Sequence, residues 1–235
     1  MCVVVLALAA DPRWRLVVAA NRDEFHNRAA APLARWDGAP ELIAGRDLLS
    51  GGTWLGVSEA GRLAVVTNVA GHPRGADAPS RGALVADFLH DERLPADAEL
   101  GRYGGFSLLT VGAAASFRTN QPAPAHRALL PGLHGISNGP LDPPASRTRT
   151  LTSMLGDWLA DDRPLAALLD LLLDESPATT GERPVFIRDA VYGTRCSTVV
   201  AINAAGEGTI IERRYDPAGN ATGETAVAFR WPPQR

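Results

Sequence analysis

The sequence predicts an α+β fold of four layers, in which two antiparallel sheets lie between outer helices. Predicted strands occupy both ends of the 235-residue chain, and predicted helices lie between them. The first two apolar runs are joined by so short a turn that they must pair antiparallel, because parallel strands need a crossover of a dozen or more residues. Both runs are apolar almost without alternation, which indicates cover on both faces. These features favour a helix–sheet–sheet–helix (α-β-β-α) sandwich.

The strands follow from short apolar runs bounded by turn residues. Cys2–Ala10 reads as a buried strand, Asp11-Pro12-Arg13 as a tight turn, and Trp14–Ala20 as the returning strand. The same criteria predict six further strands, at Gly52–Val57, Arg62–Asn68, Gly105–Val111, Cys196–Asn203, Thr209–Tyr215 and Thr225–Trp231.

Three helices are predicted between these groups of strands. One covers Arg81–His90 with Ser80 as its N-cap, and a second covers Arg147–Leu159. The third covers Pro164–Leu173, whose leucines recur at helical spacing. Asp161 and Asp162 are predicted to cap it. Loops rich in Pro and Gly fall at Gly71–Pro79 and Gly139–Pro144, but no break in composition divides the chain, so residues 1–235 are predicted to form one domain.

Composition excludes several classes of protein. The net charge is −3 and the basic residues are scattered arginines, whereas a nucleic-acid binder should carry a basic stripe. Two cysteines are too few for a disulfide framework and suit a reducing compartment. No apolar stretch reaches the ~18 residues that indicate a membrane span. We therefore expect a cytoplasmic protein with no nucleic-acid partner.

Two apparent motifs carry no function. Gly135-Ile136-Ser137-Asn138-Gly139 matches the G-x-S-x-G nucleophile elbow, but every histidine precedes Ser137, which excludes the Ser–acid–His order. Gly51–Gly56 (GGTWLG) lacks the lysine of a phosphate-binding loop and reads as a turn into a strand. The five histidines are scattered and no metal-ligand spacing occurs, so we expect neither a metal nor another cofactor.

The remaining candidate for chemistry is Cys2. Because cysteine is small, removal of Met1 is chemically plausible and would place a thiol and a free α-amine on one residue. An α-amine titrates near ~7.7–8.0, so a useful fraction is neutral at pH 7 and can accept the thiol proton. Nucleophile and base would then be the same residue. A cysteine at position 2 is weak evidence alone, since a buried apolar-like cysteine is the simpler interpretation.

Polar residues that follow apolar runs support the reactive interpretation. Asn21-Arg22-Asp23-Glu24 follows the returning strand, and the hairpin should bring it close to residue 2. Asn68 and Asn138 each follow an apolar run, and Arg195 immediately precedes the run that begins at Cys196. Together these residues supply a carboxylate, amide donors and a cation, although each asparagine alone is more typical of a turn.

These residues also resemble a known family. Asn21-Arg22-Asp23-Glu24 is the signature of the NRDE family, also called the transport and Golgi organisation protein 2 family. The resemblance spans almost the whole chain through six further segments: Met1-Cys2, Gly51–Gly56, Thr67-Asn68, Ser80-Arg81-Gly82, Ser137-Asn138-Gly139 and Gly193–Thr198, with a last match at Ile211–Tyr215.

The family is similar to cysteine N-terminal-nucleophile hydrolases, such as penicillin V acylases and bile-salt hydrolases. That similarity implies Cys2 as nucleophile with its own amine as base, and Asp23 as the residue that orients the amine. It implies Asn68 and Asn138 as oxyanion-hole donors. Arg195 would lie beside the thiolate and lower its pKa. Asn21, Arg22 and Trp54, from the matched segments, are assigned to substrate binding.

One departure from those acylases concerns an arginine. They carry it a few residues before the aspartate, where this chain has Ala20 and Asn21. Arg22 is adjacent to Asp23, so on a strand its side chain would point the other way. Hydrolytic competence is therefore in question.

Two functions remain open at this stage. The first is an amidohydrolase that cleaves a linear carbon–nitrogen amide through an acyl-cysteine intermediate. The second is a non-catalytic protein that binds or moves a lipid, an acyl thioester or haem on the same fold. In either case the partner is a small-molecule amide or acyl ligand. A structural or interaction module is the weakest alternative, because it leaves the polar cluster unexplained.

Overall fold

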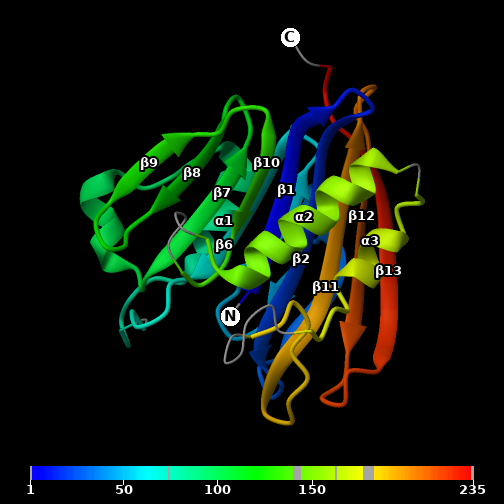
Figure 1. Ribbon diagram of the computed structural model, residues 1–235. Coiled ribbons are helices and arrows are strands. Elements are labelled where there is room, and N and C mark those ends of the chain that lie inside the picture. The colour runs from blue at the N-terminus through cyan, green and yellow to red at the C-terminus, as the bar shows by residue number, and fades with distance from the viewer. Residues whose placement is uncertain (1, 74, 140–143, 162, 177–182, 234–235) are drawn as a thin grey trace. The chain divides into compact units, whose positions relative to one another are not determined.

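The computed structural model describes residues 2–73, 75–139, 144–161, 163–176 and 183–233 (Figure 1). The chain forms two compact units. Among the described residues, unit 1 comprises those up to Arg28 and those from Pro131 to Pro233, and unit 2 comprises Ala29–Leu130. Each unit is built on its own antiparallel sheet. That the whole chain is a single domain stays a prediction.

Unit 1 contains a six-stranded sheet in the order β10-β1-β2-β11-β12-β13. Every neighbouring pair is antiparallel. The two ends of the sequence meet here because β2, from the N-terminal hairpin, pairs with β11 from the C-terminal third. The strands are β10 (Gly132–Ile136), β1 (Cys2–Asp11), β2 (Trp14–Phe25), β11 (Tyr192–Asn203), β12 (Glu207–Tyr215) and β13 (Ala221–Arg230).

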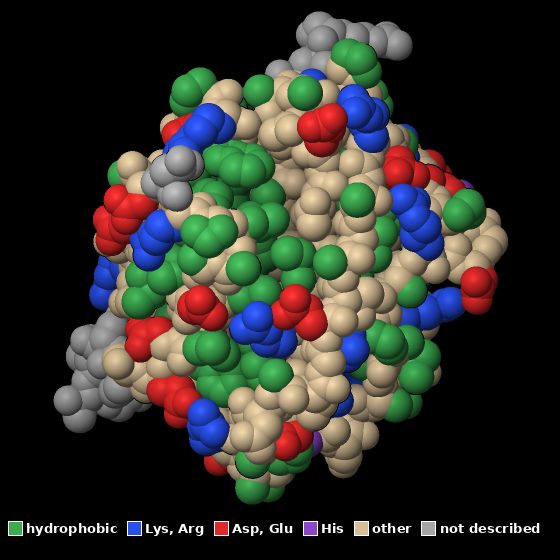
Figure 2. Space-filling model, turned by 90° about the vertical axis from the view of Figure 1, so that its right-hand side faces the viewer, with side chains coloured by type: hydrophobic (Ala, Val, Ile, Leu, Met, Phe, Trp, Pro, Cys, Tyr) green, Lys and Arg blue, Asp and Glu red, His purple; other side chains and the backbone are tan. Residues whose placement is uncertain are grey.

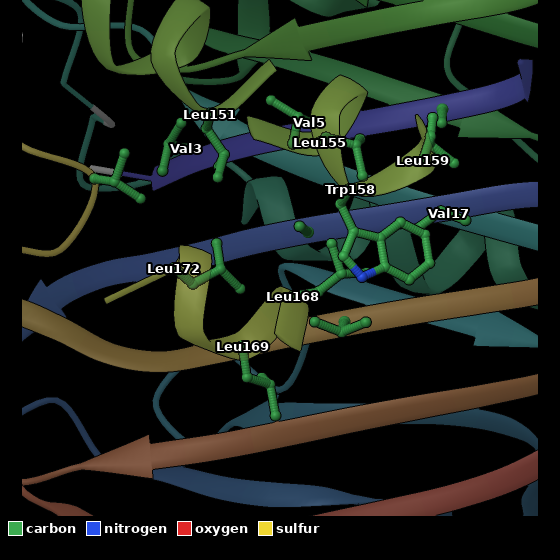
Figure 3. Packing of buried hydrophobic residues seen from close by; sticks show 14 residues of the cluster. Val3, Val5, Val17, Leu151, Leu155, Trp158, Leu159, Leu168, Leu169 and Leu172 are labelled. Carbon is green, nitrogen blue, oxygen red and sulfur yellow. The ribbon is translucent and has the colours of Figure 1, made fainter. Parts of the chain in front are cut away.

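Helices α2 (Ser146–Ala160) and α3 (Ala167–Leu171) cover one face of this sheet. Helix α2 packs over β1 and β10, and α3 packs over β11 (Figure 1). Their apolar side chains meet alternate residues of the strands, as expected where one face of a strand points to a helix layer. Figure 3 shows Trp158 at the centre of this core. The core includes Val3, Val5, Val17, Val199, Leu151, Leu155, Leu168 and Leu172.

The opposite face of the central strands is buried as well. Val4, Leu6 and Val18 alternate with the helix-facing residues and are 0% exposed. This explains why the two runs lack the apolar–polar alternation of a half-exposed sheet. The prediction of a tight antiparallel hairpin at the N-terminus is confirmed, since Leu6 pairs with Val18 and the turn lies at Asp11–Trp14.

Two of the strand boundaries that differ from the prediction concern site residues. Strand β2 continues to Phe25, so Asn21, Arg22, Asp23 and Glu24 lie within the strand and not after it. Strand β11 begins at Tyr192, so Arg195 is also inside a strand. The pairing of β2 with β11 shifts register at Arg195, because Thr194 faces Asp23 while Cys196 faces Arg22. Pairing with neighbouring strands extends the strands through these polar residues.

Unit 2 contains a seven-stranded sheet whose strands follow one another in chain order. Helix α1 (Arg81–Asp91) covers one face, with Leu84, Phe88 and Leu89 packed on the sheet. A short 3₁₀ helix spans Asp97–Arg102. The strands are β3 (Ala30–Trp36), β4 (Ala39–Asp47), β5 (Leu55–Ser58), β6 (Arg62–Asn68), β7 (Phe106–Val111), β8 (Ala115–Thr119) and β9 (Ala125–Ala128).

The glycine-rich segment at residues 51–56 has a packing role. A Cβ atom on Gly52 would lie 2.5 Å from the carbonyl carbon of Gly82, so only glycine permits this contact. The backbone N–H of Thr53 donates to the Gly82 carbonyl at 3.3 Å. Ser80 caps α1 as predicted, because its side chain accepts from the Gly82 N–H. Two of the matched family segments thus hold each other in place.

Several elements differ from the prediction. The third helix is only Ala167–Leu171, and Asp161 is the C-cap of α2 rather than an N-cap of α3. Asp162 and most of the Gly139–Pro144 loop lie outside the described residues. The strands β3, β4, β8 and β9 escaped prediction. Strands β8 and β9 have five and four residues, and β3 and β4 lack a sustained apolar alternation.

The molecular surface in the view of Figure 2 mixes charges of both signs. Basic and acidic side chains are interspersed around a central group of apolar side chains, and no large area of one sign appears on this face. Ion pairs such as Arg213–Glu224 and Arg230–Glu207 join opposite charges across β12 and β13. Among the described residues, no helix is both long and apolar enough to cross a membrane.

Candidate active site

Cys2 is the first residue of β1 and pairs with Arg22 of β2. Its nitrogen donates to the side-chain oxygen Oδ1 of Asn138 at 3.0 Å. Asn138 follows β10, the strand on the other side of β1, so two sheet neighbours converge on the start of the chain. Cys2 is 8% exposed. Met1 lies outside the described residues.

The environment of the Cys2 thiol is polar on the side of β2. The backbone N–H of Asp23 donates to the sulfur. Burial raises the pKa of the Cys2 thiol, and the carboxylate of Asp23 acts in the same direction. The guanidinium of Arg22 lowers this pKa, so it opposes the effect of burial.

Asp23 is the buried carboxylate of the site, and its side chain is 0% exposed. Its Oδ1 accepts from the hydroxyl of Thr194 at 2.8 Å, and its Oδ2 accepts from Nη2 of Arg147 at 2.8 Å. Burial raises the pKa of the Asp23 carboxyl, and the charge of Arg147 is the largest influence in the opposite direction. The phenol of Tyr192 donates to the Asp23 backbone carbonyl at 2.7 Å, which also fixes the main chain.

Asn21 belongs to a buried network beneath the site. Its Nδ2 donates to the carbonyls of Leu172 and Val185, at 2.8 Å and 3.0 Å. Its Oδ1 accepts from the hydroxyl of Ser197 at 2.6 Å, and Tyr215 donates to that hydroxyl at 3.1 Å. Asn21 is 0% exposed. These contacts join the end of α3 and the middle of β11 to β2. A contact of Asn21 with substrate stays a prediction.

Arg22 and Arg195 are two arginines near the thiols, and the roles assigned to them stay predictions. Arg22, assigned above to substrate binding, is the arginine whose charge lowers the pKa of the Cys2 thiol. Arg195 was expected beside the thiolate, but its Nη1 donates to the backbone carbonyls of Phe25 and Arg28, at 2.9 Å and 3.0 Å. Burial lowers the pKa of Arg195, and the neighbouring charge of Arg22 adds to this effect.

Asn68 and Trp54 belong to unit 2. Asn68 is the last residue of β6 and pairs with Phe106 of β7. Trp54 is half-buried beside the same strand, and its carbonyl accepts from the N–H of Val66 at 2.8 Å. The two residues thus lie along neighbouring parts of one sheet. Their contributions to oxyanion stabilisation and to substrate binding stay predictions.

Sequence analysis missed five residues of the Asp23 and Asn21 networks: Arg147, Tyr192, Thr194, Ser197 and Tyr215. Thr194 and Tyr215 fall inside segments that match the family. Arg147 had a signal of its own, because it lies four residues before Leu151 and eight before Leu155, on the apolar stripe of α2. A charged residue on the buried face of a helix requires a buried partner.

The side chains around Cys2 include no cluster suited to a metal. Within the described ranges, no group of three or more His, Cys, Asp or Glu side chains is arranged to hold a metal ion. Cys196, which also faces Arg22, is 6% exposed. Burial raises the pKa of the Cys196 thiol well above its ordinary value, and Glu212 adds to the rise.

Comparison with known proteins shows the family and the fold of this chain. The family model described as Transport and Golgi organisation 2 matches residues 1–217. The chain belongs to this family. The mouse Transport and Golgi organization 2 homolog is 29% identical and the bovine homolog 31% identical, and each alignment covers 91% of this chain and 92% of the relative. The Drosophila melanogaster protein is 30% identical over 47% of this chain and 46% of its own length.

Solved structures place this member of the Transport and Golgi organisation 2 family among the N-terminal-nucleophile hydrolase folds. The Caenorhabditis elegans ortholog of N-acylethanolamine-hydrolyzing acid amidase aligns with a TM-score of 0.54, 11% identity, and coverage of 84% of this chain and 92% of its own. A single-substitution variant of conjugated bile acid hydrolase from Clostridium perfringens aligns with a TM-score of 0.52, 8% identity and 97% coverage of both chains. The predicted fold class is confirmed.

Proposed function

We propose that this family member is an amidohydrolase that cleaves a linear carbon–nitrogen amide with Cys2 as its nucleophile. The proposal depends on one contact, the 3.0 Å hydrogen bond from the Cys2 nitrogen to Asn138 Oδ1. Once Met1 is removed, this nitrogen is a primary amine. An acceptor that binds one of its N–H groups restricts the direction of its lone pair, which is what a base acting on its own thiol needs.

The reaction would proceed in two steps. The amine takes the thiol proton, and the sulfur attacks the amide carbonyl to form a carbon–sulfur bond. The carbon–nitrogen bond then breaks, and the departing amine receives the proton. In the second step water hydrolyses the acyl-cysteine, releasing the carboxylic acid and restoring the thiol. This cycle splits one difficult displacement into two easier ones.

The charge on the carbonyl oxygen during attack requires hydrogen-bond donors. Asn138 holds the Cys2 nitrogen through Oδ1, so the Nδ2 end of the same side chain is the donor we assign to the oxyanion. Asn68 is the second assigned donor. Arg22, whose charge favours the thiolate, and Trp54 are assigned to contact with the substrate. Arg195, which holds Phe25 and Arg28 by backbone contacts, supports the end of β2.

The intact mass of the purified protein tests this proposal first. Loss of Met1 is expected, and a retained Met1 in active protein excludes the free-amine mechanism. The protein is then incubated with a panel of N-acyl amino acids and N-acylethanolamines, with acid and amine products quantified. Cys2→Ala should abolish product and any acyl adduct, while Cys196→Ala should retain both. No product and no adduct with any amide would contradict the proposal.

A binding role on the same fold is the second candidate. It is favoured by the burial of Cys2, because burial raises the pKa of the thiol and leaves it protonated at neutral pH. The ligand would be a lipid, an acyl thioester or haem. Titration with a long-chain acyl thioester and separately with haem, followed by fluorescence and absorbance, tests it. Saturable binding without turnover supports this candidate, and the absence of saturable binding counts against it.

A further inference from the structure

The carboxylate of Asp23 has no access to solvent in the described structure. Its side chain is 0% exposed. An ionised carboxylate is costly to bury unless it is paired and hydrogen-bonded, and otherwise it takes up a proton. The side chains of Thr194 and Arg147 both donate to Asp23, and of these two donors only Arg147 carries a charge. Whether Asp23 is ionised therefore depends strongly on Arg147.

Arg147 reaches Asp23 from a different layer of the unit. It lies in the first turn of α2, and its side chain is 7% exposed. Its Nη2 donates both to Asp23 Oδ2 at 2.8 Å and to the carbonyl of Val185 at 3.0 Å. Its Nε is buried without a hydrogen-bond partner among the described residues. The same nitrogen thus makes both contacts, and these two hydrogen bonds hold the guanidinium beside Asp23.

We propose that Arg147 is a positioning residue that keeps Asp23 ionised and aimed at the Cys2 amine. The proposal builds on the assignment of Cys2 as the nucleophile with its amine as base. A neutral Asp23 carboxyl would present a proton donor where the amine needs an acceptor. Arg147 touches no reacting atom and acts only through Asp23.

Asn21, the neighbour of Asp23 on the same face of β2, carries no charge, so the cation that pairs with Asp23 comes from helix α2. Asn21 is two residues before Asp23 on the same strand face, but its side chain is a neutral amide. Its Nδ2 donates to the same Val185 carbonyl that accepts from Arg147. The amide and the guanidinium therefore meet at one acceptor. The missing arginine at positions 20 and 21 does not leave Asp23 without a cation, because Arg147 supplies one.

A purely structural role for this ion pair makes a different prediction. If Arg147 only joined α2 to β2, its loss would lower stability and leave the ionisation of the site unchanged in the neutral range. The charged and titratable groups around Cys2 and Asp23 are the amine at the start of the chain, Arg22 and Glu24 of β2, Arg195 and Cys196 of β11, and Arg147 of α2. A variant of Arg147 alone changes one member of this set.

The pH dependence of Cys2 alkylation by iodoacetamide tests the proposal. Rates are measured by mass spectrometry from pH 5 to 10 for the full chain, with the alkylation of Cys2 and of Cys196 quantified separately. Without its cation, the pKa of the Asp23 carboxyl, which burial already raises, should rise further. The profile of Arg147→Met should therefore gain a bend that the parent profile lacks, with a rate change of about threefold, equivalent to about half a unit in the thiol pKa.

Three further variants complete the test. Asp23→Asn/Arg147→Met should lack the bend, and Arg149→Met, in the same helix turn and exposed, should match the parent protein. Arg147→Lys keeps the charge on a shorter arm and should show a smaller displacement. If Arg147→Met does not fold, the alkylation profile of Arg147→Lys is sufficient to test the proposal. A profile that superimposes on the parent in every folded Arg147 variant, or a bend that persists in the double variant, overturns the proposal.

Alkylation requires only the thiol, so this test does not depend on turnover. If the protein hydrolyses no amide but Arg147→Met shows the bend, the role of Arg147 is supported and the proposed activity is overturned. If the protein hydrolyses an amide but Arg147→Met shows no bend, the activity is supported and the role of Arg147 is overturned.

Discussion

Cys2 and Cys196 both pair with Arg22, from opposite sides of strand β2. Residues that pair across an antiparallel sheet point to the same face, so both thiols lie on one face with the arginine between them. Neighbouring strands are ~4.8 Å apart, which separates the two cysteine Cα atoms by about 10 Å. A disulfide requires Cα atoms less than about 7 Å apart.

The first prediction is that the two cysteines do not form an intramolecular disulfide. Folded protein treated with diamide should keep its reduced mass, because bridging would require β2 to move out of the sheet. The same treatment in urea frees the chain and should yield the bridge, which serves as the positive control. Loss of two hydrogens from folded monomer would contradict the pairing of these strands.

The second prediction concerns stability in alkali. Burial raises the pKa of the Cys196 thiol well above its ordinary value, whereas the unfolded thiol titrates near ~8.5. The folded state thus binds this proton more tightly. Its contribution to stability is fully present below about pH 8.5 and is lost as the pH rises through the folded pKa. Urea denaturation at a series of pH values should show this decline.

Cys196→Ala removes the titrating group and should flatten the decline above about pH 8.5. Part of the slope should remain, because burial also raises the pKa of the Cys2 thiol and of Tyr215. Cys2→Ala is the matched control and should flatten the curve less. An equal slope in the parent and in Cys196→Ala would show that this thiol does not titrate as a buried group.

The third prediction tests the contact that supports the proposed function. Asn138→Ala removes the acceptor of the Cys2 nitrogen and the assigned oxyanion donor. Turnover of an amide substrate should fall by about 100-fold, the scale of losing one such donor, and stability by about 1 kcal/mol. Asn203→Ala is the control, since the Asn203 side chain bonds locally to Glu207 in the exposed β11–β12 turn. Turnover in that variant should be unchanged.

The central hairpin could be predicted from the sequence because its causes are local. Continuous apolar runs and a Pro-containing turn specify Cys2–Asp11 and Trp14 onward without knowledge of the remaining chain. The strand ends were less predictable. Asp23 and Arg195 look like loop residues on their own, and they become strand residues only because β2 and β11 pair along their full lengths.

Arg147 illustrates why the site was only partly predictable. Its position in a helix was predicted, but its partner lies 124 residues earlier in the chain. No local pattern links the two. The assignment of Arg195 to the thiolate relied on resemblance and stays a prediction, while the strand register places Arg22 opposite Cys2. Sequence patterns thus identified the polar residues, whereas the register and the helix packing decide which of them meet.

The fourth prediction concerns the buried network beneath the site. Asn21 Oδ1 accepts a 2.6 Å hydrogen bond from Ser197, whose hydroxyl also accepts from Tyr215 at 3.1 Å. Ser197→Ala removes the centre of this chain and leaves a fully buried amide oxygen without its donor. A buried polar group without its partner costs about 1–3 kcal/mol. Urea denaturation should show a loss of this size.

Tyr215→Phe is the informative partner of that variant. It removes one donor but leaves the Ser197–Asn21 bond in place, and Ser197 can still use its own proton toward Asn21. The loss should therefore be smaller, about 1 kcal/mol or less. The double variant should cost little more than Ser197→Ala, because residues in one hydrogen-bond chain are not additive. Additive losses, or a larger loss from Tyr215→Phe, would mean that the Tyr215 hydroxyl stabilises the fold outside this network, because the ring contact with Phe186 remains in the Phe variant.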